Sequence, residues 1–397
     1  TISAWVYARE FHKVYNQYGH GSSIFNKGDK QYAIQAYGDT ANRLWEGAVY
    51  ANQGNGWRQV KSTEKAQAGE WVHLVVTWAG GANDNNGTAK LYLNGSLDHT
   101  EELAIGNGTG SPEMTYNLYI GANPTGGGVS APAPGTTRDL ADGTTSTPRF
   151  WNGYLDEITL SRGVRSADFV KLSYETQKAA VTAVTVGASQ TQGGDAYADW
   201  TDSRDIQLNT SVLGANVAED VHNFPVLVRL GDDEADILAD AKANGDDIRF
   251  SRNGNALPYE IESWSATKAA IWVKVDFIEG DNADQTITMH WGKSDATSES
   301  DGAAVFAVED DYVAVFHMNG TTNEIDATEH AFDATSFNDP AVDANPAIGG
   351  ARHFDGTQHM QIIGSASSAM NLLADTTYTF SAWVRNDSVG GPGHLVI

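Results

Sequence analysis

The fold is decided by a hairpin that reads Trp71-Val72-His73-Leu74-Val75-Val76-Thr77-Trp78, a turn around Asn83-Asp84-Asn85-Asn86-Gly87, and then Lys90-Leu91-Tyr92-Leu93-Asn94-Gly95. Short apolar runs that are bounded by turn residues are typical of buried strands. A turn rich in Asn and Gly between two such runs favours an antiparallel hairpin. The stretch therefore predicts two buried, paired strands.

Strand patterns of the same kind continue along the chain on both sides of this hairpin. They cover residues 31–37, 118–121, 150–161, 204–208, 225–230, 270–277 and 285–291, and the whole chain has 41 Gly against 10 Pro. Helical patterns are confined to residues 166–174 and 233–243. Many short strands joined by turns are typical of sandwiches and barrels. The sequence therefore predicts an all-β protein built from antiparallel β-sandwiches.

Charge and composition exclude several classes of protein. The chain has 397 residues, enough for two or three domains, and carries 51 acidic against 25 basic residues, a formal net charge of −26. That charge would repel nucleic acid and anionic membrane surfaces. It favours solubility in a salty medium, and clustered carboxylates are also what Ca2+ binds. There is no Cys for a disulfide or a thiolate site, and no apolar run reaches the roughly 20 residues that span a bilayer.

The two ends of the chain carry copies of one strand motif. Thr1-Ile2-Ser3-Ala4-Trp5-Val6 matches Thr379-Phe380-Ser381-Ala382-Trp383-Val384 at five of six positions, with a shift of 378 residues between positions 1 and 379. Similarity at a fixed period is the signature of a repeat protein. We therefore expect the chain to be part of a longer protein and to hold one full period plus the start of the next.

Five segments follow from these patterns. A first domain without its first strands is predicted at 1–178, and a small, polar, Gly-rich linker at 179–199. A second domain follows at 200–292, an acidic linker or irregular strap at 293–310, and the truncated first part of another domain at 311–397. Each piece of the repeated domain alone would expose an unpaired sheet edge. We expect 311–397 to pair with 1–178 of a neighbouring copy, or the chain to continue beyond both ends.

An ordered set of motifs in the repeated domain resembles a known family. The hairpin is followed by Leu118-Tyr119-Ile120-Gly121 and Phe150-Trp151-Asn152-Gly153-Tyr154-Leu155-Asp156-Glu157-Ile158. The later segment carries Tyr312-Val313-Ala314-Val315-Phe316-His317-Met318 and Gly350-Ala351-Arg352-His353-Phe354-Asp355-Gly356. Together these residues resemble the laminin-G-like, concanavalin-A-like jelly-roll family. The resemblance implies that both pieces belong to one type of antiparallel jelly roll.

The middle of the chain resembles a different family. Asp246-Asp247-Ile248-Arg249-Phe250, Leu257-Pro258-Tyr259-Glu260-Ile261-Glu262 and Met289-His290-Trp291-Gly292 follow the order of a bacterial domain of unknown function, family 2341. Such domains accompany laminin-G-like modules in large bacterial surface proteins, so the resemblance implies a secreted protein at the bacterial cell surface. Some members are associated with proton-channel proteins of the MotA/TolQ/ExbB type. The resemblance thus implies such a motor as a partner at the base of an extracellular fibre.

The jelly-roll resemblance also implies a structural Ca2+ where the first and last strands meet. Asp156 follows a tight Asn-Gly turn and is the expected ligand, since Ca2+ accepts carboxylates together with backbone carbonyls. Its alternative role is to cap the turn or to pair with Arg149 or Arg162. Asp326 and Asp355 lie in the other piece of the domain, so they would complete a metal site only across the junction.

Three aromatic residues are candidates for contact with a sugar or another polymer. Trp45, Tyr50 and Trp57 lie among Gly, Asn and Gln, where core packing is a less direct explanation than for Trp71 or Trp78. Exposed aromatic rings stack on the apolar faces of ligands. We therefore predict that these three residues bind a ligand, with burial in the core as the alternative.

No catalytic set stands out from the sequence. Glu260 and Glu262 are two residues apart on a predicted strand and so share one face, which is compatible with a pair of acid and base carboxylates. No cleft motif accompanies them. The Glu-x-Asp-x-x-Glu strand of concanavalin-like glycosidases is also absent, because Tyr154 stands two residues before Asp156. We expect the chain not to be an enzyme.

These observations favour a tandem-repeat segment of a secreted bacterial surface adhesin or extracellular fibre. It would be a calcium-stabilised binding or spacer module that associates with neighbouring copies of itself. The alternative is a carbohydrate-binding module appended to a polysaccharide-degrading enzyme, with a cell-surface glycan as its partner. The fibre requires the 378-residue repeat between positions 1 and 379, whereas the module requires an aromatic platform on a concave face.

Overall fold

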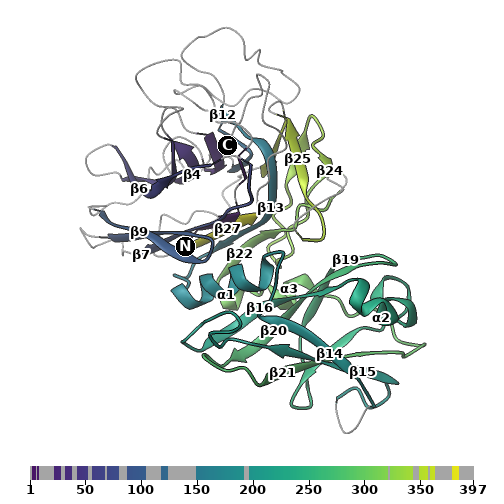
Figure 1. Cartoon of the computed structure of the whole chain (residues 1–397). Helices are drawn as coiled ribbons and strands as arrows, with labels where there is room; N and C mark the ends of the chain where they lie inside the picture. Colours follow the sequence, from purple (N-terminus) through teal and green to yellow (C-terminus); the bar gives the residue numbers. More distant parts are fainter. Residues whose placement is uncertain are drawn as a thin grey trace.

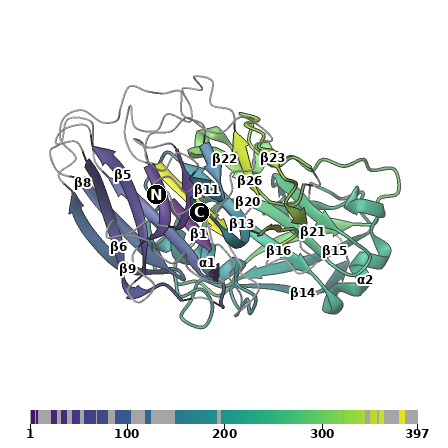
Figure 2. The same ribbon diagram turned by 90° about the horizontal axis from the view of Figure 1, so that it is seen from above.

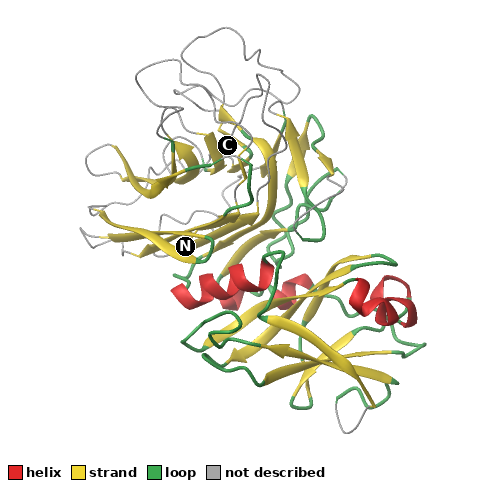
Figure 3. Ribbon diagram, viewed as in Figure 1, coloured by secondary structure: helices red, strands yellow, loops and turns green. Residues whose placement is uncertain are grey.

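A computed structural model of the chain describes residues 2–5, 7–8, 22–27, 32–37, 43–51, 56–67, 69–79, 87–103, 118–123, 149–191, 196–320, 322–342, 348–355, 358–362 and 378–383. These residues form two β-sandwich domains that lie side by side (Figure 1, Figure 2). Strands make up most of both domains, and a helix lies at their junction (Figure 3). None of the helices in the described ranges is long and apolar enough to cross a membrane.

The larger domain is a jelly roll whose first sheet surrounds one long strand, β13 (Asn152–Ser161). Its other strands are β1 (Ile2–Trp5), β2 (Tyr7–Ala8), β7 (His73–Ala79), β8 (Gly87–Leu93), β9 (Ser96–Leu103), β22 (Tyr312–Phe316), β24 (Ala341–Val342), β25 (Arg352–Asp355) and β27 (Tyr378–Trp383). The order is β24-β25-β13-β1-β7-β8-β9, and β2, β22 and β27 also pair with β13. β7 and β8 form the hairpin that the sequence predicted, with Leu74 opposite Leu93.

The second sheet packs on the first and closes the sandwich. Its strands are β3 (Ser22–Asn26), β4 (Tyr32–Tyr37), β5 (Leu44–Ala51), β6 (Gly56–Lys65), β10 (Leu118–Ile120), β23 (Thr335–Phe337) and β26 (His359–Ile362). They follow the order β23-β26-β10-β3-β4-β5-β6, and a short separate pair joins β11 (Ala122–Asn123) to β12 (Arg149–Phe150). Side chains from both sheets fill one core that includes Trp45, Leu74, Trp151, Phe354 and Met360. The predicted all-β sandwich is confirmed.

Strands from the two ends of the chain pair with each other inside this jelly roll. β22 pairs with β13, with Phe316 opposite Ile158, and β25 pairs with the preceding part of β13. In the second sheet, β26 pairs with β10, with Ile362 opposite Leu118. We expected segment 311–397 to complete a neighbouring copy or to continue outside the chain. In this structure it covers edges of its own chain's jelly roll, which would otherwise be unpaired.

Both copies of the repeated motif pair with the same part of the first sheet. β1 pairs with β7, with Ile2 opposite Val76, and β27 also pairs with β7, with Phe380 opposite Val76. Ile2 and Phe380 are equivalent positions of the two motif copies. Both strands also pair with β13. The strand β1 pairs with it at Leu160, and β27 pairs with it at Asp156. Both copies therefore register on one position between β7 and β13, which we call the shared slot.

The smaller domain is a second β-sandwich. One sheet contains β14 (Val184–Thr191), β15 (Asp202–Leu208), β17 (Arg249–Arg252), β18 (Asn255–Ala256) and β21 (Gln285–Trp291), and the other contains β16 (Val221–Leu230), β19 (Tyr259–Trp264) and β20 (Ala269–Ile278). Phe224, Phe250 and Met289 lie in the core between the sheets. β14 pairs with β15 although it lies within 179–199, the stretch predicted to be a linker. This domain therefore begins before Trp200.

The helix predicted at 233–243 is divided into shorter pieces. A 3-10 turn, η1 (Asp232–Glu234), leads into α2 (Ala235–Asp240), and a second 3-10 turn, η2 (Ala243–Gly245), follows. The helix α2 ends because the backbone of Ala241 is extended. Ile237 is buried in the core of the smaller domain, so the apolar side of the predicted helix faces inward.

A packed segment connects the smaller domain to β22. It contains α3 (Gly302–Val305) and η3 (Val308–Asp310). The ring of Phe306 packs edge-on against Trp272 and Tyr312, with ring centroids 5.8 and 5.3 Å apart. The sequence analysis gave two alternatives for residues 293–310, a linker or an irregular strap. These residues include a packed, irregular strap and are not a free linker.

The helix α1 (Ala167–Gln177) lies between the two domains (Figure 1). It begins after Ser166, whose hydroxyl accepts the backbone N–H of Phe169 at 3.0 Å and so caps the first turn. Val170 packs with Val75 of the jelly roll, whereas Leu172 belongs to the core of the smaller domain. Because one helix is buried in both domains, they share an apolar junction.

Candidate functional site

Two consecutive acidic residues of β13 face the smaller domain. Leu155 and Ile158 both lie in the jelly-roll core although they are three residues apart, so Asp156 and Glu157 between them share the other side of the strand, as in a β-bulge. Glu157 has a positive φ of 49°, which is uncommon for a residue other than glycine. Both side chains are buried. The bulge thus places two carboxylates at the junction.

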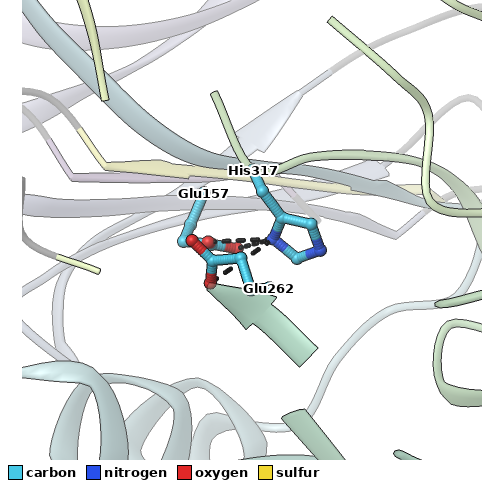
Figure 4. Close-up of side chains that lie close together, drawn as sticks. All are labelled: Glu157, Glu262 and His317. Atoms are coloured by element: carbon cyan, nitrogen blue, oxygen red, sulfur yellow. Dashed lines mark hydrogen bonds and ion pairs between the residues drawn. The ribbon is translucent and has the colours of Figure 1, made fainter. Parts of the chain in front are cut away.

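His317 directly follows β22 and lies between carboxylates of both domains. Its Nδ1 is 3.0 Å from Oε1 of Glu157 in the jelly roll and 3.8 Å from Oε2 of Glu262 in the smaller domain. Its Nε2 is 3.0 Å from Oε2 of Glu260. Figure 4 shows the imidazole ring facing Glu157 and Glu262. We call Asp156, Glu157, Glu260, Glu262 and His317 the junction cluster.

Contacts from both domains hold Glu262 in position. The indole Nε1 of Trp272 donates to its Oε2 at 2.9 Å, and the backbone N–H of Gly350 donates to its Oε1 at 3.3 Å. A side chain at Gly349 would collide with this carboxylate, so glycine at this position leaves space for Glu262. The Trp272 ring also stacks against His317, with centroids 6.0 Å apart. The orientation of Glu262 is therefore fixed by packing as well as by hydrogen bonds.

Burial and the concentration of negative charge shift the pKa values of the cluster. Burial raises the pKa of Asp156 well above its usual range, and the charges of Glu157 and Glu262 raise it further. Burial and the charge of Glu157 raise the pKa of Glu262 in the same way. Burial alone would lower the pKa of His317, but Glu157 and Glu260 beside it raise that pKa well above its usual value. The cluster therefore favours a positive charge at its centre.

Of the residues expected to bind Ca2+, Asp156 and Asp326 take part in different sets of hydrogen bonds. Asp156 is in the junction cluster, where its Oδ2 accepts the backbone N–H of Ile348 at 3.1 Å. Asp355 lies on β25, and its side chain is outside the described residues. Ca2+ takes six to eight oxygen ligands, whereas the ligand atoms around Asp156 include an imidazole nitrogen. The junction cluster therefore does not fit the calcium site that the resemblance implied.

Asp326 supports a turn instead. Its carboxylate accepts the backbone N–H groups of Val315, Thr328 and Phe332 and the hydroxyl of Thr328, at 2.9–3.0 Å. These four donors occupy both oxygens, which stabilises the loop after β22. Asp326 is thus committed to local hydrogen bonds and is not a member of the junction cluster.

The three aromatic candidates for ligand binding have different positions. Trp45 is 2% exposed and packs inside the jelly roll, so its ring is not available for stacking and the alternative of core burial applies. Tyr50 and Trp57 are directly opposite each other on β5 and β6. Opposed residues share one face of a sheet. The side chains of Tyr50 and Trp57 are outside the described residues.

Glu157 and His317 are the cluster members that the sequence did not single out. For Glu157 a signal was present, since the three-residue spacing of the apolar residues around Asp156 and Glu157 breaks the alternation of a strand and indicates a bulge. His317 had no comparable signal, because its carboxylate partners come from β13 and β19. That contact depends on how the two domains pack.

Comparison with known families identifies both domains. Residues 1–141 match the family described as the concanavalin A-like lectin/glucanases superfamily, and residues 244–334 match the domain of unknown function DUF2341. The chain carries a concanavalin A-like domain and a DUF2341 domain. Neither the curated proteins nor the solved structures gave a significant match. Both family resemblances of the sequence are confirmed.

The DUF2341 match extends beyond the smaller sandwich. It includes the strap and β22, and so contains Glu260, Glu262 and His317. Asp156 and Glu157 belong to the concanavalin A-like sandwich, so the junction cluster joins the two domains. A superfamily of lectins and glucanases supports a carbohydrate-binding or extracellular module in general.

Proposed function

We propose that the chain is a repeat segment of a secreted bacterial surface adhesin or extracellular fibre, which acts as a binding and spacer module and not as an enzyme. The main support for this proposal is the shared slot. Two copies of one motif, from opposite ends of the chain, register on Val76 of β7, whereas one side of a strand accepts a single partner at a given residue. A chain that contains slightly more than one period of a tandem array has this redundancy.

In such an array the jelly roll becomes continuous in sequence. The strand at 379–384 takes the place of residues 1–6, and the chain runs on through the equivalents of residues 7–178. Concanavalin A-like and DUF2341 domains then alternate, and α1 and the strap pack each junction. Domains joined by exposed, flexible linkers move independently. Packed connections favour a stiff array, in which neighbouring copies are the partners of each unit.

A protein of two periods tests the spacer role. Joining residue 378 directly to residue 1 of a second copy keeps the motif in register. Because each junction is packed, we expect the maximum dimension in small-angle scattering to grow in proportion to the number of periods, with a narrow distribution of bend angles in electron micrographs. The chain of one period is the matched control. A broad distribution of bend angles would contradict a stiff spacer.

A carbohydrate-binding module is the second candidate, favoured by polar side chains that lie across three strands of the second sheet. Gln35 Nε2 donates to Oε1 of Glu46 at 2.6 Å, and Lys61 Nζ lies 3.3 Å from the other oxygen of Glu46. The Lys61 ammonium also lies over the ring of Tyr37, 4.9 Å from its centroid. Gln35 and Glu46 are buried. The half-buried ring of Tyr37 and the partly exposed Lys61 are therefore the groups that this face offers to a sugar.

Calorimetry against a panel of soluble polysaccharides tests this second candidate. If the sheet binds a glycan, Tyr37→Ala is expected to weaken binding roughly tenfold, because the ring supplies the stacking surface. Glu64→Gln, at an exposed position of β6, is the matched control and should bind like the unaltered chain. Binding that Tyr37→Ala leaves unchanged would exclude this face of the sheet.

A further inference from the structure

The junction cluster contains more acidic than basic side chains in a largely buried space. Its four carboxylates have one imidazole among them, and one guanidinium, that of Arg229, donates to the carbonyl oxygens of Thr176 and Gln177 while it interacts with the cluster electrostatically. Buried charges are stable when they are paired or coordinate a metal. With all four carboxylates ionised, one imidazolium and one guanidinium leave negative charge in excess; protonation of Asp156 and Glu262, whose pKa values are raised, or a bound cation would each offset it.

An oxygen of Asp156 gives an independent sign of such a cation. The side chain is completely buried, and Oδ2 accepts the backbone N–H of Ile348. Within the described part of the chain, Oδ1 has no hydrogen-bond partner. Asp156 shares its side of β13 with Glu157, and its electrostatic neighbours are Glu157, Glu262 and His317. Since buried polar atoms are almost always satisfied, this oxygen points to a ligand between these side chains.

The ligand atoms lie close enough together for one ion. Glu157, Glu262 and His317 each offer one atom, and these atoms all lie within 4.8 Å of one another. The Nδ1 of His317 is 3.0 Å from Oε1 of Glu157 and 3.8 Å from Oε2 of Glu262. A tetrahedral ion with bonds of about 2.1 Å has ligand atoms about 3.4 Å apart. Small side-chain shifts would therefore bring all three atoms into bonding distance.

The contacts around these atoms have the arrangement that metal sites use. Glu260 lies 3.0 Å from Nε2 of His317, so it can accept the Nε2 proton while Nδ1 binds an ion. The Trp272 indole donates to Glu262. Partners of this kind orient the ligands of a metal and set the histidine tautomer.

We propose that Glu157, Glu262 and the Nδ1 of His317 bind one divalent transition-metal ion of the Zn2+ class, with water in the fourth position. Carboxylate and imidazole ligands in a four-coordinate set suit Zn2+, whereas Ca2+ prefers a larger set of oxygens. The ion replaces the proton on Nδ1 and ties the concanavalin A-like domain to the DUF2341 domain. The inference rests on the junction alone and is independent of the repeat array.

Zinc titration of the full chain, after treatment with a chelator and dialysis, tests the site. We expect one equivalent of Zn2+ by calorimetry and by metal analysis, and a higher unfolding temperature when it is bound. Glu262→Gln and His317→Gln should lose stoichiometric binding, and Glu260→Gln should bind ten- to hundredfold more weakly. Asp233→Asn, which alters an exposed carboxylate, is the matched control and should bind like the unaltered chain.

If a variant does not fold, nitrogen NMR of the histidine rings in the unaltered chain still tests the proposal. In the unaltered chain, Zn2+ is expected to remove the proton from Nδ1 of one histidine and to leave the proton on its Nε2. A His317 ring that stays doubly protonated in saturating Zn2+ would overturn the proposal. So would the absence of a bound equivalent of Zn2+, binding of Ca2+ but not Zn2+, or unchanged Zn2+ affinity in a folded His317→Gln variant.

Discussion

A chain with both Ser3→Pro and Ser381→Pro is expected to lose about 3 kcal/mol or more of its free energy of unfolding, although each substitution alone should cost less than about 1 kcal/mol. Proline removes a backbone donor and is not tolerated in a central strand. Ser3 and Ser381 are equivalent positions of the repeated motif. Since both copies register on the shared slot, one intact copy is enough to fill it. Urea unfolding followed by circular dichroism measures the three free energies.

The non-additivity of the two substitutions is the decisive quantity. Ser3→Ala and Ser381→Ala keep the backbone donor, so these variants are matched controls and should unfold like the unaltered chain. If Ser3→Pro alone were as costly as the double substitution, β27 would not replace β1. If the two costs simply added, each strand would have a site of its own, and the redundancy that supports the repeat proposal would be lost.

Strands with long apolar runs were predictable from the sequence, whereas edge strands of small and polar residues were not. β7 and β20 are buried along most of their length, and their sequences show it directly. β14 lies in a stretch rich in Thr, Ala, Ser and Gly, and it pairs on one side only, with β15. An edge strand needs few apolar side chains, so its composition is close to that of a linker.

Local composition was also a poor guide to the exposure of Trp45. Its polar and Gly-rich neighbours favoured a ligand contact, but alternation along β5 places Trp45 and Val49 on the core side. The polar residue Glu46 between them faces the other side of the sheet, where Gln35 and Lys61 bind it. The two-residue period of the strand sets the face of the sheet that a residue occupies. The identity of the neighbouring residues does not set it.

The junction cluster was predictable only in part, for a different physical reason. The common face of Glu260 and Glu262 follows from the two-residue period of a strand. Their contact with His317 and Glu157 depends on the packing of α1 and the strap between the domains. No pattern local to one strand encodes that packing.

Trp272→Ala is expected to cost about 3–5 kcal/mol of the free energy of unfolding. The side chain is 1% exposed and packs with Phe306, Tyr312 and Leu227 in a core that both domains share. Its loss leaves a cavity and removes the indole donor from the buried Glu262 carboxylate. We therefore expect a lower urea midpoint, and unfolding of the two domains in separate steps as their common core is lost. Urea unfolding followed by both fluorescence and circular dichroism tests this result.

Two further variants separate packing from hydrogen bonding at the same position. Trp272→Phe keeps most of the apolar contact but leaves Glu262 without its indole donor, so it should cost about 1–3 kcal/mol. Trp264→Ala, on β19 at the rim of the smaller core, is the matched control; because Trp264 is partly exposed, the variant should cost less and leave the two domains coupled. If Trp272→Ala unfolded at the same urea concentration as the unaltered chain, the shared core would not hold the domains together, and the stiffness that a spacer needs would require another source.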